Sequence, residues 1–294
     1  MHPAPSIIFF TVFSGLGFGL MIFLGLGMPP LAMSGGGTSF IFFAIAYALA
    51  VGGLLSSTLH LGNPQRALKA FSQWKSSWLS REGCLAVATL IVMGIYAIGI
   101  IFLGQRWGLL GLIGSLLSLA TVIATSMIYT QIKTVPRWSH WTTPVLFVAY
   151  AITGGAFLAG QTLLATFFLL VLALLQLAAW IIGDKQFNES GSTIETATGL
   201  GHMGKVRMFE APHSSKNYLM KEMVHQVGRK HSKTLRVIGI LLLTLIPWVL
   251  LTLAGANHFL IAIAILFHVA GALTTRWLFF AEAEHTVGLY YGKR

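Results

Sequence analysis

Long uninterrupted runs of apolar residues, separated by short polar connections, dominate the chain. Eight such runs recur, at about 6–28, 40–60, 83–104, 108–131, 143–160, 163–183, 236–254 and 257–281. Each is long enough to cross a bilayer core of roughly 30 Å as a helix. None shows the apolar and polar alternation of a barrel strand. The pattern therefore predicts an all-α integral membrane protein, a bundle of about eight transmembrane helices.

Composition supports this fold class. The chain of 294 residues is 55% hydrophobic and 9% charged, and its mean hydropathy is +0.77, whereas soluble domains are roughly 25% charged. The N-terminal residues 1–5 form no basic n-region, because they contain no Lys or Arg, and the first run is long enough to stay in the membrane. We therefore expect it to remain as a span rather than to be cleaved as a signal peptide. We expect residues 1–294 to form a single transmembrane domain.

Glycines recur inside the first two apolar runs. Gly15, Gly19, Gly52 and Gly53 are examples. Small residues let helices approach closely in membranes. We therefore expect these glycines to mark contacts between helices rather than a ligand site.

Lysine and arginine gather in every second connection. The basic connections are 61–81, 132–142, 184–235 and the C-terminal tail, whereas the alternate ones carry only Arg106. By the positive-inside rule the basic set faces the cytoplasm. The pattern predicts a multi-pass protein of the bacterial inner membrane with both termini and the His60 face cytoplasmic. The net charge of +11 then reflects topology and docking, and no nucleic-acid partner is expected.

The connection 184–235, between spans six and seven, is the largest extramembrane piece. Its second half places apolar residues at helical spacing over 219–227. Such a helix fits two roles, lying on the membrane surface or docking a partner protein, and the sequence leaves both open. The basic residues expected to dock a partner are Lys205, Arg207, Arg229 and Lys230.

Few residues are available to ligate a cofactor. Cys84 is the one cysteine, which excludes a thiolate-ligated iron–sulfur cluster, a cysteine zinc site and an internal disulfide. A membrane haem needs two His at one depth. Of His60, His258, His268 and His285, only the first and last share a depth, and each of these two also fits a role without haem. No haem and no metal site are expected.

His60 ends the second span and Glu82 opens the third, with a basic connection between them. An imidazole changes charge near neutral pH, and a carboxylate nearby takes a second proton, so the pair suits proton transfer at the lipid boundary. Arg66 or Arg81 would keep the carboxylate ionised. The alternatives are a span-end His bonded to the backbone and an acid favoured by the helix dipole.

These motifs, taken together, resemble the dimethyl sulfoxide reductase membrane anchor family. The order of the landmarks and the number of spans are also similar to that family, and the landmarks are scattered over most of the chain. The stretches that carry the resemblance are His60-Leu61-Gly62-Asn63-Pro64-Gln65-Arg66-Ala67, Ser80-Arg81-Glu82, Thr134-Val135-Pro136-Arg137-Trp138 with Thr143-Pro144, Arg276, and His285-Thr286-Val287-Gly288.

The resemblance implies a subunit of a three-part molybdenum enzyme. A catalytic subunit would hold the molybdopterin, an electron-transfer subunit would hold iron–sulfur clusters, and the anchor would exchange electrons with menaquinone or ubiquinone. In the family, the His and the acid associated with quinol map to His60 and Glu82. The family anchor is also expected to lack haem.

Other residues near the same face are candidates for a quinone pocket. Trp74 and Trp78 could cover a quinone ring or belong to an interfacial aromatic belt. Arg276 lies deeper in the last span and is expected to face protein rather than lipid. His285 could line the pocket or serve docking and packing. The acids expected to pair with Arg276 or with a basic connection are Glu282 and Glu284.

The predicted orientation departs from the best-known members of that family. There the His-Leu-Gly face is periplasmic, whereas the basic connections place it in the cytoplasm here. The membrane subunit of the sulfite-oxidising molybdenum enzymes faces the cytoplasm, and its long basic connection is similar. Sulfite dehydrogenase and sulfoxide reductase both stay open, with electrons entering quinone in the first and leaving quinol in the second.

Two other functional classes compete. A transporter needs ionisable groups near span centres, and the centres here hold almost none. A purely structural anchor without a quinone site is the second alternative. It predicts that His60→Ala and Glu82→Gln leave quinone-linked turnover intact.

Overall fold

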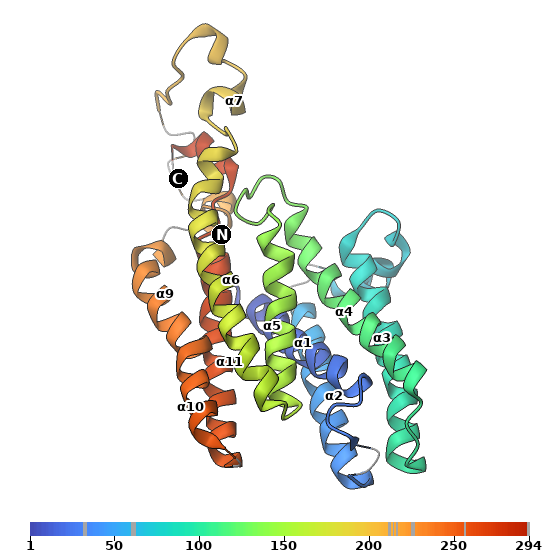
Figure 1. Ribbon diagram of the computed structural model, residues 1–294. Helices are drawn as coiled ribbons and strands as arrows, with labels where there is room; N and C mark the ends of the chain where they lie inside the picture. The colour runs from blue at the N-terminus through green and yellow to red at the C-terminus, as the bar shows by residue number, and fades with distance from the viewer. Residues whose placement is uncertain are drawn as a thin grey trace.

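The computed structural model is a bundle of long helices lying side by side, with one segment projecting beyond it (Figure 1). It describes residues 1–31, 34–59, 63–210, 213, 215, 217–224, 227–255 and 257–292. Over these ranges the regular structure is entirely helical, without a strand. The predicted all-α class is confirmed.

Within the described residues, seven helices are long and apolar enough to cross a membrane, and α5 is a shorter apolar helix of 17 residues. The apolar runs fold as helices because a membrane span must satisfy its backbone hydrogen bonds internally. The chain is a multi-pass membrane protein. The spans are α1 (Pro5–Gly25), α2 (Gly36–Thr58), α3 (Trp78–Leu103), α4 (Gly108–Thr130), α5 (Thr142–Leu158), α6 (Thr162–Glu189), a composite span at Arg229–Ala254, and α11 (His258–Ala281).

The composite span changes its helical period in the middle. Its parts are the end of the 3-10 helix η4 (Val227–His231), α9 (Ser232–Ile240), a π-helical turn η5 (Leu241–Leu245) and α10 (Ile246–Ala254). Such π turns shift the hydrogen-bonding ladder by one residue and occur frequently at functional sites. Here the turn packs against α11 and α6, and its buried residues are Leu243 and Thr244.

Helix α1 is the centre of the bundle, because 78% of its most apolar stretch of 18 residues is buried. It packs against α2, α4 and α5. Gly19 lies against the backbone of Ala151, and Gly53 of α2 lies against Ser14, with no room for a side chain at either glycine. The prediction of close helix contacts is confirmed at Gly19 and Gly53. At Gly15 and Gly52 a side chain would meet nothing within 4 Å.

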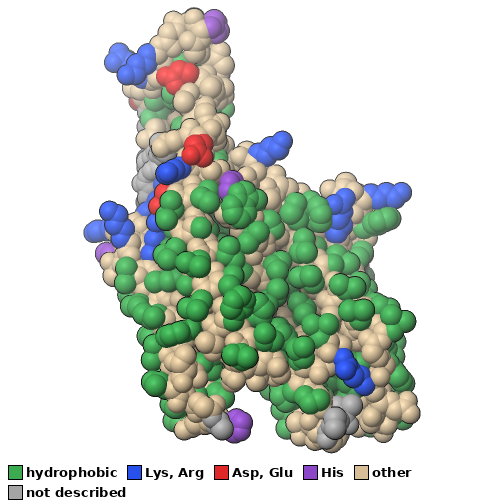
Figure 2. Space-filling view, in the orientation of Figure 1, with side chains coloured by type: hydrophobic (Ala, Val, Ile, Leu, Met, Phe, Trp, Pro, Cys, Tyr) green, Lys and Arg blue, Asp and Glu red, His purple; other side chains and the backbone are tan. Residues whose placement is uncertain are grey.

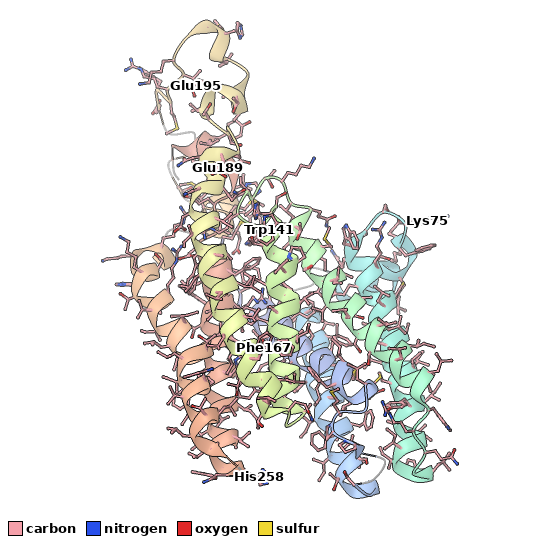
Figure 3. The ribbon with its side chains drawn as sticks, viewed as in Figure 1. Lys75, Trp141, Phe167, Glu189, Glu195 and His258 are labelled. Carbon is pink, nitrogen blue, oxygen red and sulfur yellow. The ribbon has the colours of Figure 1, made fainter. Side chains whose placement is uncertain are left out.

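Charged side chains gather at one end of the bundle. We call it the basic end, formed by connections 63–77 and 131–141, the described residues between 190 and 231, and residues 282–292. Figure 2 shows most of the visible Lys and Arg toward this end. In Figure 3, Lys75, Glu189 and Glu195 lie toward it and His258 lies at the opposite end. The alternation of basic and neutral connections therefore corresponds to two chemically different faces.

The connection between α6 and α9 forms the projecting segment. Its elements are α7 (Ile194–Thr198), the 3-10 helix η3 (Gly201–Met203) and α8 (Tyr218–Glu222). The C-terminal 3-10 helix η6 (Thr286–Tyr291) supports it, because the Tyr290 hydroxyl donates a 2.6 Å hydrogen bond to the Ala197 carbonyl. The prediction of a helix over 219–227 is wrong in length. The α-helix ends at Glu222, whose carbonyl is bound by the backbone N–H of His2 at 2.7 Å.

Candidate functional site

The structure locates part of the predicted proton-transfer pair. His60 lies outside the described residues, and so does the side chain of Arg66. Glu82 and Arg81 are both placed, at the start of α3. The site is therefore built outward from Glu82.

Glu82 is buried inside the bundle, with 4% of its surface exposed. Helix α3 starts at Trp78, capped by the side chain of Ser77, so Glu82 lies one turn inside it rather than at its mouth. The Thr125 hydroxyl of α4 donates a hydrogen bond of 2.5 Å to Glu82 Oε1. In the part of the chain that the structure describes, this is the carboxylate's one hydrogen bond, and it has no ion pair.

Arg81 turns away from Glu82 toward the preceding connection. Its guanidinium donates to the carbonyls of Trp74 (2.9 Å) and Lys75 (2.7 Å) and lies 4.3 Å from the centroid of the Trp78 ring. The expected pairing of Arg81 with the acid is therefore absent between these two described residues. The guanidinium instead covers one face of the Trp78 ring. The Trp74 side chain is about half exposed.

The 3-10 helix η2 (Pro64–Gln73) lies against the start of α3. The Phe71 ring contacts Gly83, where an added side chain atom would lie 3.2 Å from it. Phe71 therefore covers the backbone directly after Glu82. Of the aromatic residues in this connection, Phe71 is thus the one that contacts the helix beside the acid.

Arg276 of α11 is the second buried ionisable group, with 5% of its surface exposed. Its guanidinium lies over the rings of Phe147 (3.9 Å), Tyr150 (5.2 Å) and Phe279 (5.3 Å). Among the placed side chains it forms no ion pair, although a cation over aromatic faces is stabilised by their quadrupoles. The prediction that it faces protein is confirmed.

Tyr150 of α5 connects three helices next to Arg276. Its hydroxyl lies 2.7 Å from Gln176 Oε1 of α6 and 2.7 Å from Thr275 Oγ1 of α11. Gln176 and Thr275 are both buried. The spans thus contain a polar cluster inside the bundle, close to the Glu82 level.

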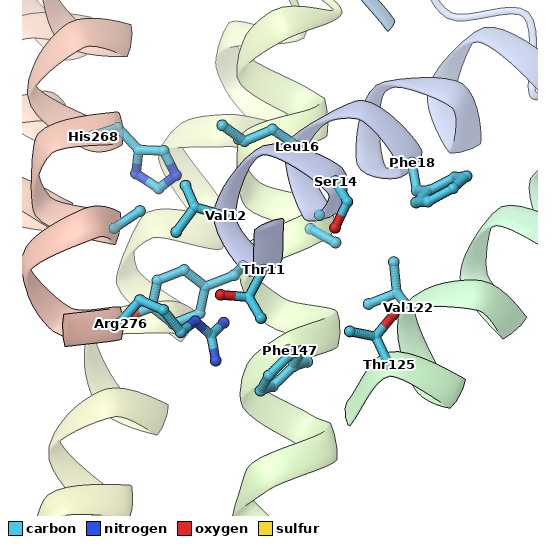
Figure 4. A pocket seen from close by; sticks show the side chains of 14 residues that line it. Thr11, Val12, Ser14, Leu16, Phe18, Val122, Thr125, Phe147, His268 and Arg276 are labelled. Carbon is cyan, nitrogen blue, oxygen red and sulfur yellow. The ribbon is translucent and has the colours of Figure 1, made fainter. Parts of the chain in front are cut away.

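Two small cavities flank Arg276 and Tyr150. The first has a volume of about 20 Å³ (Figure 4), and the second has a volume of about 40 Å³. Polar residues that line the first are Thr11, Ser14, Thr125, Tyr150, His268 and Arg276. Polar residues that line the second are Arg137, Thr142, Thr143, Tyr150, Gln176, Thr275, Arg276 and Glu282.

His268 closes the deep end of the first cavity. Its Nδ1 atom lies 2.8 Å from the Leu243 carbonyl, in the π-helical turn η5, and its ring stacks on Phe157 at 5.1 Å. Its Nε2 atom is buried and finds no hydrogen-bond partner among the described residues. The π-helical turn thus supplies the carbonyl that orients the imidazole.

An ion network closes the basic end above the second cavity. Arg137 binds Asp184 (2.5 Å) and Glu282 (3.4 Å), and Arg236 binds the same two acids (2.6 and 2.7 Å). Glu284 pairs with Arg229 at 2.8 Å. The sequence predicts that Glu282 and Glu284 pair either with Arg276 or with a basic connection, and the structure has the second of these pairings. The other residues expected to dock a partner, Lys205, Arg207 and Lys230, are exposed.

His285 lies beyond the end of α11 and lines neither cavity. Its Nδ1 accepts a 3.0 Å hydrogen bond from the backbone N–H of Val287 and so caps η6. Burial lowers the pKa of His285 below its ordinary value. Over the described residues, no three His, Cys, Asp or Glu side chains are grouped as metal ligands.

The sequence-based prediction missed Thr125, Tyr150 and Gln176. A signal for them exists, because each is a polar residue inside an apolar run. Such residues usually face the bundle interior or a partner helix. The sequence alone does not say which neighbour each one meets.

Comparisons with known proteins agree with this architecture. The profile of the family described as DMSO reductase anchor subunit (DmsC) matches residues 1–292. A sulfite dehydrogenase subunit from Allochromatium vinosum is 30% identical over 99% of both chains. No solved structure matches. Because the family profile covers nearly the whole chain, the resemblance drawn from the scattered motifs is confirmed, and the chain belongs to the DMSO reductase anchor subunit family.

Proposed function

We propose that this chain is the quinone-reactive membrane anchor of a molybdopterin oxidoreductase complex. It exchanges electrons between an iron–sulfur partner subunit and menaquinone or ubiquinone. The observation that carries the proposal is Glu82, a carboxylate buried inside the bundle with a single hydroxyl as its partner among the described residues. Burying an acid without a paired cation costs several kcal/mol, so its presence is better explained by proton transfer than by stability.

The side chains around Glu82 support a proton-transfer role. Quinone reduction takes up two electrons and two protons, and quinol oxidation releases them. The single cysteine requires the electrons to pass through clusters of another subunit. Glu82 would hold or release one proton at its carboxylate, with Thr125 fixing the orientation of that group. His60, assigned from the motif, would hold the other.

The sulfite-oxidising branch is the better-supported version of this function. The relative from Allochromatium vinosum is named as a subunit of sulfite dehydrogenase. The basic end fits the cytoplasmic face of a bacterial inner membrane, and exposed Lys205, Arg207 and Lys230 lie there for the partner subunits. Electrons would then flow from sulfite, oxidised by the catalytic partner, into quinone.

Substitution of Glu82 in the assembled complex tests the quinone site. Glu82→Gln should lower quinone-linked turnover by about 10²- to 10⁴-fold, the range typical of a positioned proton-transfer group. Dye-linked turnover of the catalytic partner should stay at the wild-type level. Glu195→Gln, which changes an acid on the projecting segment, is the control and should change neither rate. Intact quinone-linked turnover in Glu82→Gln would favour a purely structural anchor.

Two further measurements test the complex and its orientation. The tagged chain should co-purify with iron–sulfur and molybdopterin subunits. Purification without these subunits would contradict the proposal and favour a transporter. A reporter fused after Arg294 should be active in its cytoplasmic form. If only a reporter that is active in the periplasm works at this position, the predicted topology is wrong and the sulfoxide reductase branch is favoured.

A further inference from the structure

The two cavities and their lining residues make one polar line from Glu82 to the basic end. Thr125 binds Glu82 and lines the first cavity. Tyr150 and Arg276 line both cavities. Glu282 lines the second cavity and belongs to the ion network at the basic end. The lining residues of the two cavities are therefore sufficient to connect the two acids.

The size of the cavities decides what they hold. A water molecule needs roughly 10–15 Å³ of such volume. The first cavity, of about 20 Å³, therefore fits one water, and the second, of about 40 Å³, fits two or three. Neither has room for a quinone ring. Both are lined by hydroxyl and guanidinium groups that bind water.

Unpartnered buried polar atoms point to the same occupant. Arg276 Nε and His268 Nε2 are buried and have no hydrogen bond within the described structure. Arg276 is 5% exposed and His268 is 1% exposed, and both line the first cavity (Figure 4). A buried polar group without any partner costs about 1–3 kcal/mol, and more when it is charged. Ordered water in the cavities removes this cost.

We propose that ordered water in these two cavities links Glu82 to Glu282 and conducts the protons of the quinone reaction between Glu82 and the basic end. The inference rests on the proposed function. Tyr150 is a positioning residue in this path, because it lines both cavities and its hydroxyl is bound to Gln176 and Thr275, which line the second. Protons then reach Glu82 through the protein interior rather than directly through connection 63–77.

The proton balance of the path is simple. For each quinone reduced, two electrons come from the iron–sulfur partner and two protons enter from water at the basic end. Glu82 gives one proton to a quinone oxygen, and its carboxylate is reprotonated through the water beside Thr125. The second quinone oxygen takes its proton from His60, as in the proposed function. In quinol oxidation every transfer runs in reverse. No bond other than O–H is formed or broken along the path.

Arg276 gives the path a barrier against leakage. Its positive charge opposes a free hydronium ion in either cavity, as an arginine does in water channels that exclude protons. A proton therefore moves only when Glu82 releases or accepts one. Proton movement is in this way tied to quinone chemistry at Glu82.

Removal of one hydroxyl tests the path in the assembled complex. Tyr150→Phe keeps the ring beside Arg276 but loses the hydroxyl that is bound to Gln176 and Thr275 in the lining of the second cavity. Quinone-linked turnover should fall by roughly tenfold to a hundredfold, at the lower end of what proton-transfer groups contribute, and its solvent deuterium isotope effect should rise. Dye-linked turnover should not change. Tyr47→Phe is the matched control, because Tyr47 donates to the Leu90 carbonyl and lines neither cavity.

The outcomes separate this inference from the proposed function. Wild-type quinone-linked turnover and isotope effect in Tyr150→Phe, together with loss of turnover in Glu82→Gln, would overturn the interior path and leave the quinone site standing. Intact turnover in Glu82→Gln would instead contradict the proposed function.

A measurement on the wild-type complex covers the case in which Tyr150→Phe does not assemble. Short X-ray pulses generate hydroxyl radicals from bound water and label the side chains beside it. Tyr150 should be labelled and Tyr96 should not, because Tyr96 is fully buried and lines neither cavity. Equal protection of both tyrosines would show dry cavities and refute the water path.

Discussion

The Nε atom of Arg236 donates a 2.7 Å hydrogen bond to the buried carboxylate of Glu282 and so ties α9 to the end of α11. The rest of the Arg236 guanidinium binds Asp184 of α6. Arg137, from the connection before α5, binds the same two acids. Four side chains from four parts of the sequence therefore hold the basic end together.

The two acids of this network should contribute unequally to stability. Side-chain exposure is 5% for Glu282 and 46% for Asp184. Breaking a buried pair costs about 3–5 kcal/mol, whereas an exposed pair contributes about 1 kcal/mol or less. Glu282→Ala should therefore lower the thermal unfolding midpoint of the purified complex clearly more than Asp184→Ala does. Equal shifts, or the reverse order, would contradict the assignment of Glu282 as the buried centre.

Thr125 should matter for turnover because its hydroxyl is the donor that orients Glu82. Thr125→Val removes the donor at nearly constant volume, and we expect a loss of quinone-linked turnover on the order of tenfold. Thr125→Ser, which keeps the hydroxyl, should retain most of the rate. Both rates are measured beside dye-linked turnover in the same membranes.

Thr121→Val is the control for Thr125→Val. Thr121 lies one turn earlier on α4, and its hydroxyl lies 3.1 Å from that of Thr89, away from Glu82. Quinone-linked turnover should stay near the wild-type rate in this variant. If the two valine variants lose the same activity, the effect is one of helix packing and not of Glu82 orientation.

The sequence predicts the spans well because apolar length alone specifies a membrane helix. It places the start of the third span less well. The apolar run begins at Gly83, but α3 begins at Trp78, because Ser77 caps the helix and the polar residues Arg81 and Glu82 lie within its first turns. Glu82 is therefore about four residues, or roughly 6 Å, inside the helix. This difference turns a boundary acid into a buried one.

The polar cluster could not be predicted from the sequence for a different reason. Thr125 and Glu82 are 43 residues apart, and Tyr150 and Thr275 are 125 residues apart. An apolar run shows that a helix spans the membrane, but it does not show how that helix is rotated against its neighbours. The long helices that the structure describes are apolar around most of their circumference. The position of a polar residue in the sequence therefore does not identify the helix that it contacts.

Helix contacts at α1 give a prediction about two glycines that look alike in sequence. A side chain at Gly19 would collide with the Ala151 backbone, whereas one at Gly52 would meet nothing within 4 Å. Overpacking costs about 1–3 kcal/mol or more when backbone must move. Gly19→Val should therefore reduce the amount of folded chain in membranes, and Gly52→Val should not. Similar losses in both variants would mean that glycine acts there through helix propensity alone.

His285 should make the C-terminal segment sensitive to pH. Its Nδ1 accepts a hydrogen bond from the Val287 N–H, which only the neutral imidazole allows. Because burial lowers the pKa of His285 in the folded chain, the cap is fully present above the ordinary histidine value of about 6.5. It is lost as the pH falls below that value and through the lowered pKa of the folded state.

Hydrogen exchange at the Val287 amide measures this dependence. After correction for the intrinsic exchange rate, protection in the wild-type chain should fall between pH 8 and pH 5. His285→Asn supplies a side-chain oxygen that accepts the same bond without titrating, so its protection should stay nearly constant. Amides in the middle of α3 serve as the internal reference and should not respond. A flat wild-type profile, or the same slope in His285→Asn, would show that another group controls this segment, since Thr286 also donates to the Thr134 carbonyl and anchors it independently.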